Sequence, residues 1–448
     1  MGIKNKSPDS DAGFVTLEEF KGVSDAQAWA LANTRCAATG KSILLTKMYS
    51  IDTNINLTAG VSVAGKNRVN TGLTFSGTAA LTHAGTDGTK NGGNITLSNF
   101  LISHTSFGVA LKLRNCLDVL CEDVEFYHAS VTAYNFSYLT FRDCIGFDMG
   151  FVASNAANNL NESPKFLGGR YSNVTLTTTE TTDVVLDDAH WLGPSSQILC
   201  SRGSHNAGLY PLVTINNVVV DSTNNECISL NGMSPRISNT FVSGGRTNLK
   251  PGIYLVDCKE GAISATTARY CGSNGLQMES CYGIDVSGAT LTDNKLYGAQ
   301  IATCSKITFR GNLLGNTAGW FGGSYVQTYG IVDSPENCID TIVTDNKFVG
   351  NSTSPVYMPN NSTVFGINIG LVRSSYGTAS VTTVTGSATI AHGLGAVPKT
   401  ASAIAISGAD IDTQITALDS TNITIRTRTS TTNANISAAA TILWRAQL

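Results

Sequence analysis

The chain has 448 residues, of which 42% are hydrophobic and only 14% are charged, and its formal net charge is −3. This balance excludes a disordered chain, and the length predicts two or three folded units unless a repeat extends one of them. The 44 glycines, together with Asn, Ser and Thr between short apolar runs, favour strands joined by tight turns over a helical bundle.

Expectations about binding partners and location follow from what the sequence lacks. It has no polybasic run for nucleic-acid phosphates and no apolar run near the roughly 20 residues that span a bilayer, so we expect no nucleic acid and no membrane insertion. Residues 1–11 are polar and lack the apolar core of a signal peptide. We therefore expect synthesis and folding in a cytoplasm.

The 11 cysteines are an odd number and include no Cys-x-x-Cys pair and no Cys/His cluster with zinc spacing. We interpret them as buried, reduced thiols that act as small apolar residues. The sequence therefore predicts no disulfide framework, no metal and no cofactor.

A helix is predicted near the N-terminus. Ser24 and Gln27 form a capping-box pattern, the Ala-rich segment that follows suits a helix, and Gly40 is typical of a helix end. Residues 42–45 and 51–57 then read as short strands. A helix across the open end of a repeat structure would shield its first unpaired strands.

A repeat follows in the middle of the chain. Gly252, Gly275 and Gly298 lie 23 residues apart, and each begins a segment in which apolar and polar residues alternate, as in a strand with one buried face. The cysteines that close these segments share the spacing and predict a stacked corner; they are Cys258, Cys281 and Cys304. This fixed period predicts an all-β solenoid, a single-stranded parallel β-helix.

The remaining segments complete the predicted organisation. Residues 377–448 are Thr-rich with short alternating strands, which indicates a small β-sandwich. The predicted domains are an N-terminal segment with the helix and first strands (1–93), the β-helix (94–351), a linker (352–376) and the sandwich (377–448).

The N-terminal sequence resembles a known superfamily. The predicted helix followed by GKSILL at 40–45, YSI at 49–51 and LTAGVSVAGK at 57–66 is similar to the start of the pectate-lyase-like right-handed parallel β-helix. Within that superfamily, residues 14–351 most resemble bacteriophage tailspike depolymerases. The segment HGLGAVP at 392–398 also resembles a motif in the C-terminal domains of phage tail proteins.

This resemblance implies a function and a set of partners. It implies a spike in the virion tail that binds phage virion proteins, forms a homotrimer and cleaves a bacterial capsular polysaccharide or O-antigen at the host cell surface. Endoglycosidic hydrolysis is the leading interpretation. A polysaccharide lyase acting on a uronate polymer and a non-catalytic receptor-binding spike are the alternatives, and a secreted plant-polymer enzyme is disfavoured by the missing signal peptide.

Hydrolysis of a glycosidic bond requires two carboxylates, about 5–5.5 Å apart in retaining enzymes and about 6.5–9.5 Å apart in inverting ones. Outward carboxylates one or two coils apart could satisfy either geometry, because coils are spaced by about 4.8 Å. The first candidate cluster contains such acids beside a titratable imidazole and an aromatic plane for a sugar ring, namely Asp187, Asp188, His190 and Trp191. The alternative is that the two acids form a turn and that Trp191 packs under a loop.

The second candidate group follows from strand alternation in the repeat. Leu276 and Met278 should face inward, which turns Gln277 and Glu279 outward, and Tyr254 lies outward one coil earlier. The predicted catalytic acids of this group are Glu226, Asp257 and Glu279, with Tyr254 and Gln277 as sugar-binding residues. The alternative is a set of ordinary solvated carboxylates.

Other segments carry weaker signals. Trp320 and Tyr325 lie in an apparent insertion and could form a ligand wall or a subunit contact. The charged run at residues 121–128 is a less favoured site. A lyase would need a cation to neutralise a uronate carboxylate, and the candidates are Lys250, Lys259, Lys295, Arg246, Arg269 and Arg310.

Overall fold

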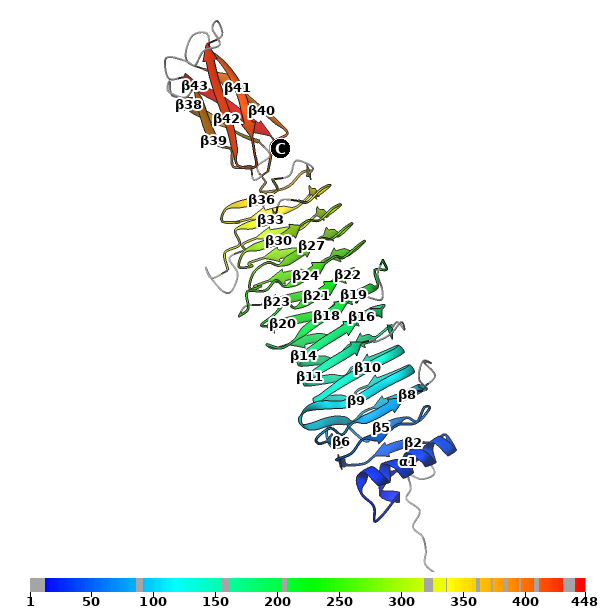
Figure 1. The fold of residues 1–448 in the computed structure, drawn as a ribbon. Coiled ribbons are helices and arrows are strands. Elements are labelled where there is room, and N and C mark those ends of the chain that lie inside the picture. The colour runs from blue at the N-terminus through cyan, green and yellow to red at the C-terminus, as the bar shows by residue number, and fades with distance from the viewer. Residues whose placement is uncertain are drawn as a thin grey trace, which may run out of the picture. The chain divides into compact units, whose positions relative to one another are not determined.

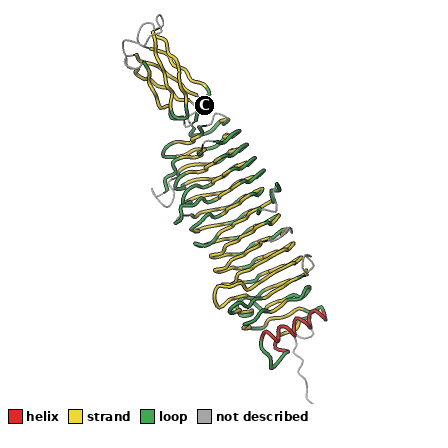
Figure 2. Tube along the Cα trace, in the orientation of Figure 1, coloured by secondary structure: helices red, strands yellow, loops and turns green. Residues whose placement is uncertain are grey.

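The computed structural model describes residues 13–85, 92–154, 161–203, 208–245, 247–317, 325–335, 337–359, 363–371, 374–381, 386–394, 396–406, 411–429 and 440–447. It contains two compact units, Met1–Asn248 and Leu249–Leu448. Both consist largely of strands, and the described residues are all-β apart from one α-helix near the N-terminus and a 3-10 turn before it (Figure 1, Figure 2).

The predicted N-terminal helix is confirmed as α1 (Asp25–Thr39), preceded by the 3-10 turn η2 (Leu17–Glu19). The Ser24 side chain accepts a hydrogen bond from the Gln27 backbone N–H, and the chain leaves the helix at Gly40 with φ +68°. The buried Trp29 donates from Nε1 to the backbone carbonyl of Asn56 at 2.8 Å, which ties the helix to the first coils.

The first unit is a stack of coils that form three parallel sheets, because each coil pairs with the next in register. Sheet A contains β1 (Phe14–Thr16), β2 (Ser42–Leu45), β5 (Val63–Gly65), β8 (Gly92–Ser98), the ends of β9 (Leu101–Glu122) and β10 (Glu125–Arg142), β13 (Lys165–Leu167), β16 (Val184–Asp187), β19 (Leu212–Asn216) and β22 (Ser234–Ser238).

Sheet B of this unit contains β3 (Met48–Ile51), β6 (Gly72–Phe75), the starts of β9 and β10, then β11 (Ile145–Ser154), β14 (Arg170–Thr179), β17 (His190–Leu192), β20 (Val219–Thr223) and β23 (Phe241–Gly244). Sheet C contains β4 (Ile55–Asn56), β7 (Leu81–Ala84), later parts of β9, β10, β11 and β14, then β18 (Gln197–Ser201) and β21 (Ile228–Asn231). The short strands β12 (Asn161–Glu162) and β15 (Thr181–Thr182) also pair in parallel.

The second unit repeats the same kind of coil. Sheet D contains β25 (Ala262–Ser264), β28 (Asp285–Ser287), β31 (Thr308–Arg310), β34 (Ile342–Thr344) and β37 (Val364–Phe365). Sheet E contains β26 (Thr267–Arg269), β29 (Thr290–Thr292), β32 (Leu313–Gly315) and β35 (Lys347–Val349). Sheet F contains β24 (Ile253–Val256), β27 (Leu276–Glu279), β30 (Tyr297–Ala302), β33 (Tyr329–Asp333) and β36 (Ser354–Tyr357).

The predicted β-sandwich is present at the C-terminal end of the second unit. One antiparallel sheet contains β38 (Ser374–Val381), β43 (Ala440–Gln447) and β40 (Thr400–Ala405). The other contains β39 (Ser387–Ala391), β42 (Asn422–Thr429) and β41 (Ile411–Leu418).

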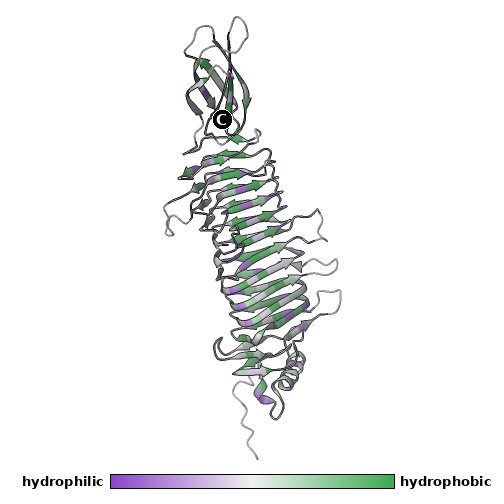
Figure 3. Cartoon of the chain, turned by 60° about the vertical axis from the view of Figure 1, so that its left-hand side comes forward, coloured by the Kyte–Doolittle hydropathy of each residue, from purple (hydrophilic) through white to green (hydrophobic). Residues whose placement is uncertain are grey.

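The core lies inside the coils, where apolar side chains from successive turns are buried. Hydrophobic and hydrophilic residues are interspersed along the coils in Figure 3. All 11 cysteines are buried and free, as predicted. The predicted corner stack is also confirmed: the backbone N–H of Cys281 donates to Sγ of Cys304 at 3.4 Å, and that of Cys304 to Sγ of Cys338 at 3.3 Å. Thiols therefore serve here as small corner residues that also accept backbone hydrogen bonds.

The extent of the coils differs from the sequence prediction. Parallel pairing begins at Phe14 instead of residue 94, and β36 and β37 add coil strands where a linker was predicted. Several first-unit strands are also much longer than predicted. They turn corners without ending because residues such as Asn115 and Asp118 within β9 adopt φ +55° and +52°, which Asn and Asp tolerate.

Candidate functional site

A groove of about 460 Å³ lies on the outer side of the first unit. It is lined by Arg68, Asp143, Ile145, Gly169, Arg170, Asp188 and His190. Ile145, Arg170 and His190 are register partners on β11, β14 and β17 of sheet B, so they form one outward column. The groove therefore follows the stacking direction across several coils.

The two carboxylates of the groove come from equivalent corners. Arg142 pairs with Leu167, and Leu167 pairs with Asp187, so the residues that follow them also correspond: Asp143, Gly168 and Asp188. All three have positive φ angles of +52°, +69° and +55°. Asp143 and Asp188 are thus two coils apart, which places their backbones about 10 Å from each other.

Glycine at the intervening corner keeps the space between the two acids open. A Cβ atom at Gly168 would lie 2.4 Å from Oδ1 of Asp143, so any larger residue would displace that carboxylate. The positive φ of Gly168 also disfavours other residues.

The charges of the groove are only partly paired. Arg68 forms an ion pair with Asp123 and lies 3.9 Å from Oε2 of Glu125. Asn217 donates to Oδ1 of Asp188 at 2.7 Å. Within the described part of the chain, the side chains of Asp143, Arg170 and His190 make no hydrogen bond or ion pair. These three groups are therefore free to contact a ligand.

Aromatic rings flank the groove on the same unit, and we call Phe107, Tyr127, His128 and Phe147 the aromatic ledge. Tyr127 and Phe147 pair in register and follow the groove column by two residues, so they face outward beside it. The His128 ring lies 4.4 Å from that of Phe107 and 4.1 Å from that of Tyr127. Phe107 is 72% exposed and Tyr127 is 44% exposed, which leaves flat apolar surface to solvent.

The first cluster predicted from sequence is split by the structure. Asp188 and His190 line the groove, whereas Asp187 lies outward on β16 and accepts a hydrogen bond from Asn216 at 2.8 Å. The prediction that Trp191 stacks against sugar is wrong. Trp191 is fully buried, with its ring 4.4 Å from that of Tyr171, because strand alternation turns it inward between His190 and Leu192.

The second predicted group lies on sheet F, where the predicted alternation is confirmed. Leu276 and Met278 are fully buried, while Gln277 and Glu279 face outward and are half-buried. Tyr254 Oη donates to Oε2 of Glu279 at 2.8 Å, and Gln277 Nε2 donates to Oε1 at 2.8 Å. Glu279 therefore lies within a hydrogen-bonded surface network.

The other two predicted acids occupy different surroundings. Asp257 follows β24 at a corner with φ +48°. Glu226, in the first unit, precedes β21 and accepts hydrogen bonds from Gln197 Nε2 at its backbone carbonyl (3.1 Å) and at Oε2 (3.5 Å).

Of the two residues predicted to form a ligand wall or a subunit contact, Tyr325 is described by the structure and Trp320 lies outside the described residues. The Tyr325 ring lies 6.0 Å from that of Tyr270, and the Arg269 guanidinium lies 5.0 Å from the Tyr270 ring.

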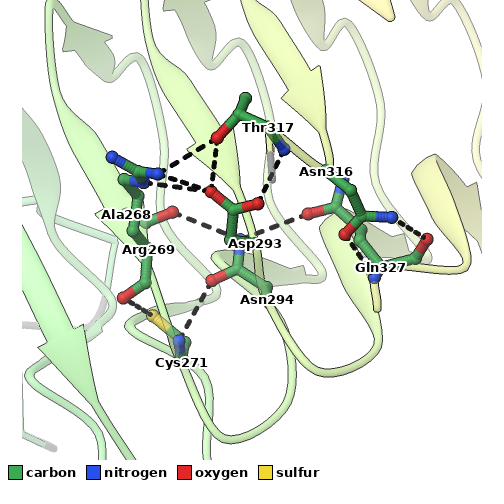
Figure 4. Close-up of polar contacts among 8 residues, drawn as sticks. All are labelled: Ala268, Arg269, Cys271, Asp293, Asn294, Asn316, Thr317 and Gln327. Carbon is green, nitrogen blue, oxygen red and sulfur yellow. Dashed lines mark hydrogen bonds and ion pairs between the residues drawn. The ribbon is translucent and has the colours of Figure 1, made fainter. Parts of the chain in front are cut away.

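Arg269 is held by Asp293, which also binds Thr317 (Figure 4). Arg269 Nη2 lies 2.6 Å from Oδ2 of Asp293, and Thr317 donates to the same carboxylate from its backbone N–H and hydroxyl, each at 2.7 Å. Burial opposes ionisation of Asp293, but the hydrogen bonds from Thr317 and Arg269 outweigh it and lower the pKa of the carboxyl.

The candidate lyase cations are therefore largely engaged. Arg269 pairs with Asp293, Arg310 Nη2 pairs with Asp285 at 2.7 Å, and Arg246 lies outside the described residues. Lys250 and Lys259 also have interaction partners. The cation best placed in a groove is instead Arg170, which sequence reasoning did not single out.

The described residues contain no group of three or more His, Cys, Asp or Glu side chains suited to hold a metal ion. No helix among them is long and apolar enough to cross a membrane.

Sequence reasoning missed Arg68, Asp143 and Arg170, and it ranked residues 121–128 low although Tyr127 and His128 belong to the aromatic ledge. The signal that could have identified Asp143 is the recurrence of Asp at corners, at Asp123, Asp143 and Asp188. It was obscured because the spacing of these corners varies.

Comparison with known proteins identifies the fold. A family model described as a right handed beta helix region matches residues 197–374. No curated protein sequence matches the chain. Among solved structures, tailspike protein 3 of bacteriophage CBA120 superimposes with a TM-score of 0.72 at 21% identity, covering 80% of this chain and 62% of that one. This chain thus spans less than two thirds of that tailspike.

Two other solved structures are similar. The A-module of a mannuronan C-5 epimerase from Azotobacter vinelandii has a TM-score of 0.55 at 14% identity, covering 79% of this chain and 99% of that one. The receptor-binding tailspike of bacteriophage Det7 has a TM-score of 0.51 at 11% identity, covering 84% and 79%. At these identities the likeness establishes the fold, a right-handed parallel β-helix of the kind found in phage tailspikes.

Proposed function

We propose that this protein is a bacteriophage tailspike that binds a bacterial surface polysaccharide, either capsule or O-antigen, and cleaves it by endoglycosidic hydrolysis. The observation that carries the proposal is the groove of the first unit, where Asp143 and Asp188 lie two coils apart beside an exposed aromatic ledge. The fold shared with tailspike protein 3 and the Det7 tailspike supports it.

The spacing of the two acids favours an inverting reaction. Their corners are about 10 Å apart, which is closer to the carboxyl separation of about 6.5–9.5 Å in inverting enzymes than to the shorter separation in retaining ones, and it leaves room for a water molecule. Asp188 accepts a hydrogen bond from Asn217, which holds its carboxylate in place, and we assign it as the base. Asp143 accepts no such hydrogen bond among the described residues, and we assign it as the acid that approaches the glycosidic oxygen.

In the proposed reaction, Asp143 gives its proton to the glycosidic oxygen as the bond to the anomeric carbon breaks. Asp188 takes a proton from the water that attacks that carbon from the opposite face. Arg68, which Asp123 holds in place, and Arg170, which has no ion-pair partner among the described residues, can donate hydrogen bonds to sugar oxygens. The aromatic ledge offers flat surfaces to sugar rings along the polymer, which suits cleavage within a chain.

Glu279 with Asp257 is the rival catalytic pair. Glu279 already accepts hydrogen bonds from Tyr254 and Gln277, which occupy both of its carboxylate oxygens. We therefore favour the groove. Cleavage that survives Asp143→Asn and Asp188→Asn but is lost in Glu279→Gln would transfer the assignment to sheet F.

A lyase is the second candidate function, and one observation favours it. Arg170 has no acidic partner in the described part of the chain and neighbours His190 in the groove column. Such a pair could neutralise a uronate carboxylate and remove the proton beside it. The product would then carry an unsaturated, ultraviolet-absorbing sugar instead of the end group left by hydrolysis.

The proposed quaternary structure is a homotrimer attached to phage virion proteins. Ile404 on β40 and Leu443 on β43 are register partners that remain 63% and 45% exposed, so this face of the sandwich leaves apolar surface for a second copy. Light scattering should give about three times the chain mass of 47.0 kDa. A monomeric mass would contradict the trimer.

The test of the proposed function is incubation with purified capsular polysaccharides and O-antigens from a panel of bacteria. We expect at least one polymer to shorten while new reducing ends appear. Retention of a polymer without any loss of length would select the non-catalytic receptor-binding spike. Ultraviolet absorbance that grows with shortening would select the lyase.

A further inference from the structure

The outward face of sheet F carries a second arrangement of side chains suited to sugar. Three columns run across its coils. The first contains Asn274, Tyr297 and Tyr329, the second contains Tyr254, Gln277, Gln300, Val332 and Tyr357, and the third contains Val256, Glu279 and Ala302. Asn274, Val332 and Ala302 are buried, and the other members are half-buried.

Glycines explain why the first column faces outward. A Cβ atom at Gly298 would lie 2.8 Å from Nε2 of the buried Gln327, so this position faces inward. Ala299 is also fully buried. Two successive inward positions break the strand alternation, and Tyr297 therefore shares the outer face with Gln300.

The tyrosines of this face form a ladder, which we define as Tyr297, Tyr329 and Tyr357. Their ring centroids are 5.9 Å and 5.8 Å apart, and adjacent rings are inclined by 57° and 54°. All three side chains are half-buried, so each ring is held by its neighbours while part of it meets solvent. Such rings provide large apolar contacts at a low cost in side-chain entropy.

Amide groups lie beside the ladder in fixed orientations. Asn274 Nδ2 donates to Oε1 of Gln300 at 2.7 Å and to Oε1 of Gln277 at 3.1 Å. Gln277 donates one N–H to Glu279, and Gln300 donates one to the carbonyl of Ser334 at 3.1 Å. Each glutamine amide carries two N–H groups and two acceptor lone pairs, so hydrogen-bonding capacity is left for sugar hydroxyls.

We propose that this face of sheet F is a second polysaccharide-binding site, which holds a neutral, hydroxyl-rich stretch of the polymer without cleaving it. The three columns contain one carboxylate, Glu279, and no cation, so they lack both a pair of acids and a partner for an acidic sugar. The glycan class rests on the proposed function, whereas the site rests on the ladder and its amides alone.

The experiment uses the full chain on an array of immobilised capsular polysaccharides and O-antigens. The parent is the double variant Asp143→Asn, Asp188→Asn, in which the groove should no longer cleave the probe. Adding Tyr297→Ala and Tyr329→Ala should weaken retention on the same glycan at least about tenfold. Tyr297→Phe with Tyr329→Phe keeps both rings and should retain binding.

Tyr282→Ala is the matched control, because Tyr282 is a 36% exposed tyrosine of the second unit outside the three columns. It should leave retention unchanged. Equal retention of the parent and the Tyr297/Tyr329 alanine variant would overturn the inference and leave the proposed function standing.

The remaining outcomes separate the two claims. If the alanine variant loses retention on a glycan that the wild-type chain never shortens, the inference holds and hydrolysis fails. If the wild-type chain retains no glycan on the array, both are contradicted. Circular dichroism and thermal melting of each variant check that a loss of binding does not reflect unfolding.

Discussion

The two units carry different surfaces on the same kind of coil. In the second unit the coils repeat every 23 residues from Gly252 to Gly298, and sheet F presents orderly columns of tyrosines and amides. In the first unit the corners are unevenly spaced and several strands run through them. The irregular coils hold the groove with two carboxylates, Arg170 and an exposed aromatic ledge. Regular stacking produces a repetitive surface, whereas variation between coils brings unlike groups together.

Removing the acids of the groove should have the largest effect and tests whether the first unit carries the site of cleavage. Asp143→Asn and Asp188→Asn should each lower the rate of cleavage by at least about 100-fold, because each removes one proton-transfer group. The readout is the release of reducing ends from the polymer selected by the panel. Asparagine tolerates the left-handed corner, so both proteins should remain folded.

A matched corner controls that prediction. Asp183 is also an exposed aspartate with positive φ in the first unit, but it does not line the groove. Asp183→Asn should keep full activity. Comparable losses in all three variants would mean that corner aspartates act on stability and not on chemistry.

The Trp191→Ala variant tests whether an inward residue of sheet B contributes to stability and not to sugar binding. It should reduce the free energy of unfolding by about 3–5 kcal/mol, because it empties a fully buried site packed against Phe166 and Tyr171. Urea denaturation measures the effect. A stable variant that loses only polysaccharide binding would restore the sugar-stacking role rejected here.

The Asp293→Asn variant tests how much the hydrogen bonds of the Asp293 carboxylate contribute to the stability of the second unit. Because the folded pKa of this carboxyl lies below the ordinary value of 3.8, its contribution to stability is fully present above that value and is lost as pH falls through the folded pKa. Asp293→Asn should cost about 1–3 kcal/mol at neutral pH. The two melting temperatures should converge below pH 3.8, and a constant difference down to strongly acidic pH would contradict the assignment.

The smallest effects are expected on the aromatic ledge. Tyr127→Ala and Phe147→Ala should each weaken polysaccharide affinity about tenfold, since each removes one stacking surface. Both side chains are more than a third exposed, so stability should change little. Isothermal titration with an oligosaccharide product measures the affinity, and unchanged binding in both variants would remove the ledge from the site.

Much of the fold was predictable because it depends on local patterns. The capping box at Ser24, the Gly40 helix end, the 23-residue repeat and the Cys258–Cys304 corner stack all recur in the structure. The first and last coils were not predictable from local patterns. Phe14 pairs with Ser42 across the whole N-terminal helix, and β36 contains Pro355 at an end of the stack.

The candidate site was only partly predictable. Strand alternation correctly separated Leu276 and Met278 from Gln277 and Glu279, because the repeat supplied the register. No repeat was available around Asp187, and the orientation of Trp191 was therefore misjudged by one position, which changes the face of a strand. Asp143 and Asp188 are brought together only by corners of unequal spacing, which stacking in three dimensions reveals.

The most direct test is a crystal structure of the Asp143→Asn variant with an oligosaccharide of the polymer that the wild-type chain shortens. We predict sugar rings on the aromatic ledge and a glycosidic oxygen within hydrogen-bonding distance of residue 143, with Asp188 facing the other side of the anomeric carbon. An oligosaccharide bound only on sheet F, with the groove of the first unit empty, would contradict the assignment of that groove as the site of cleavage.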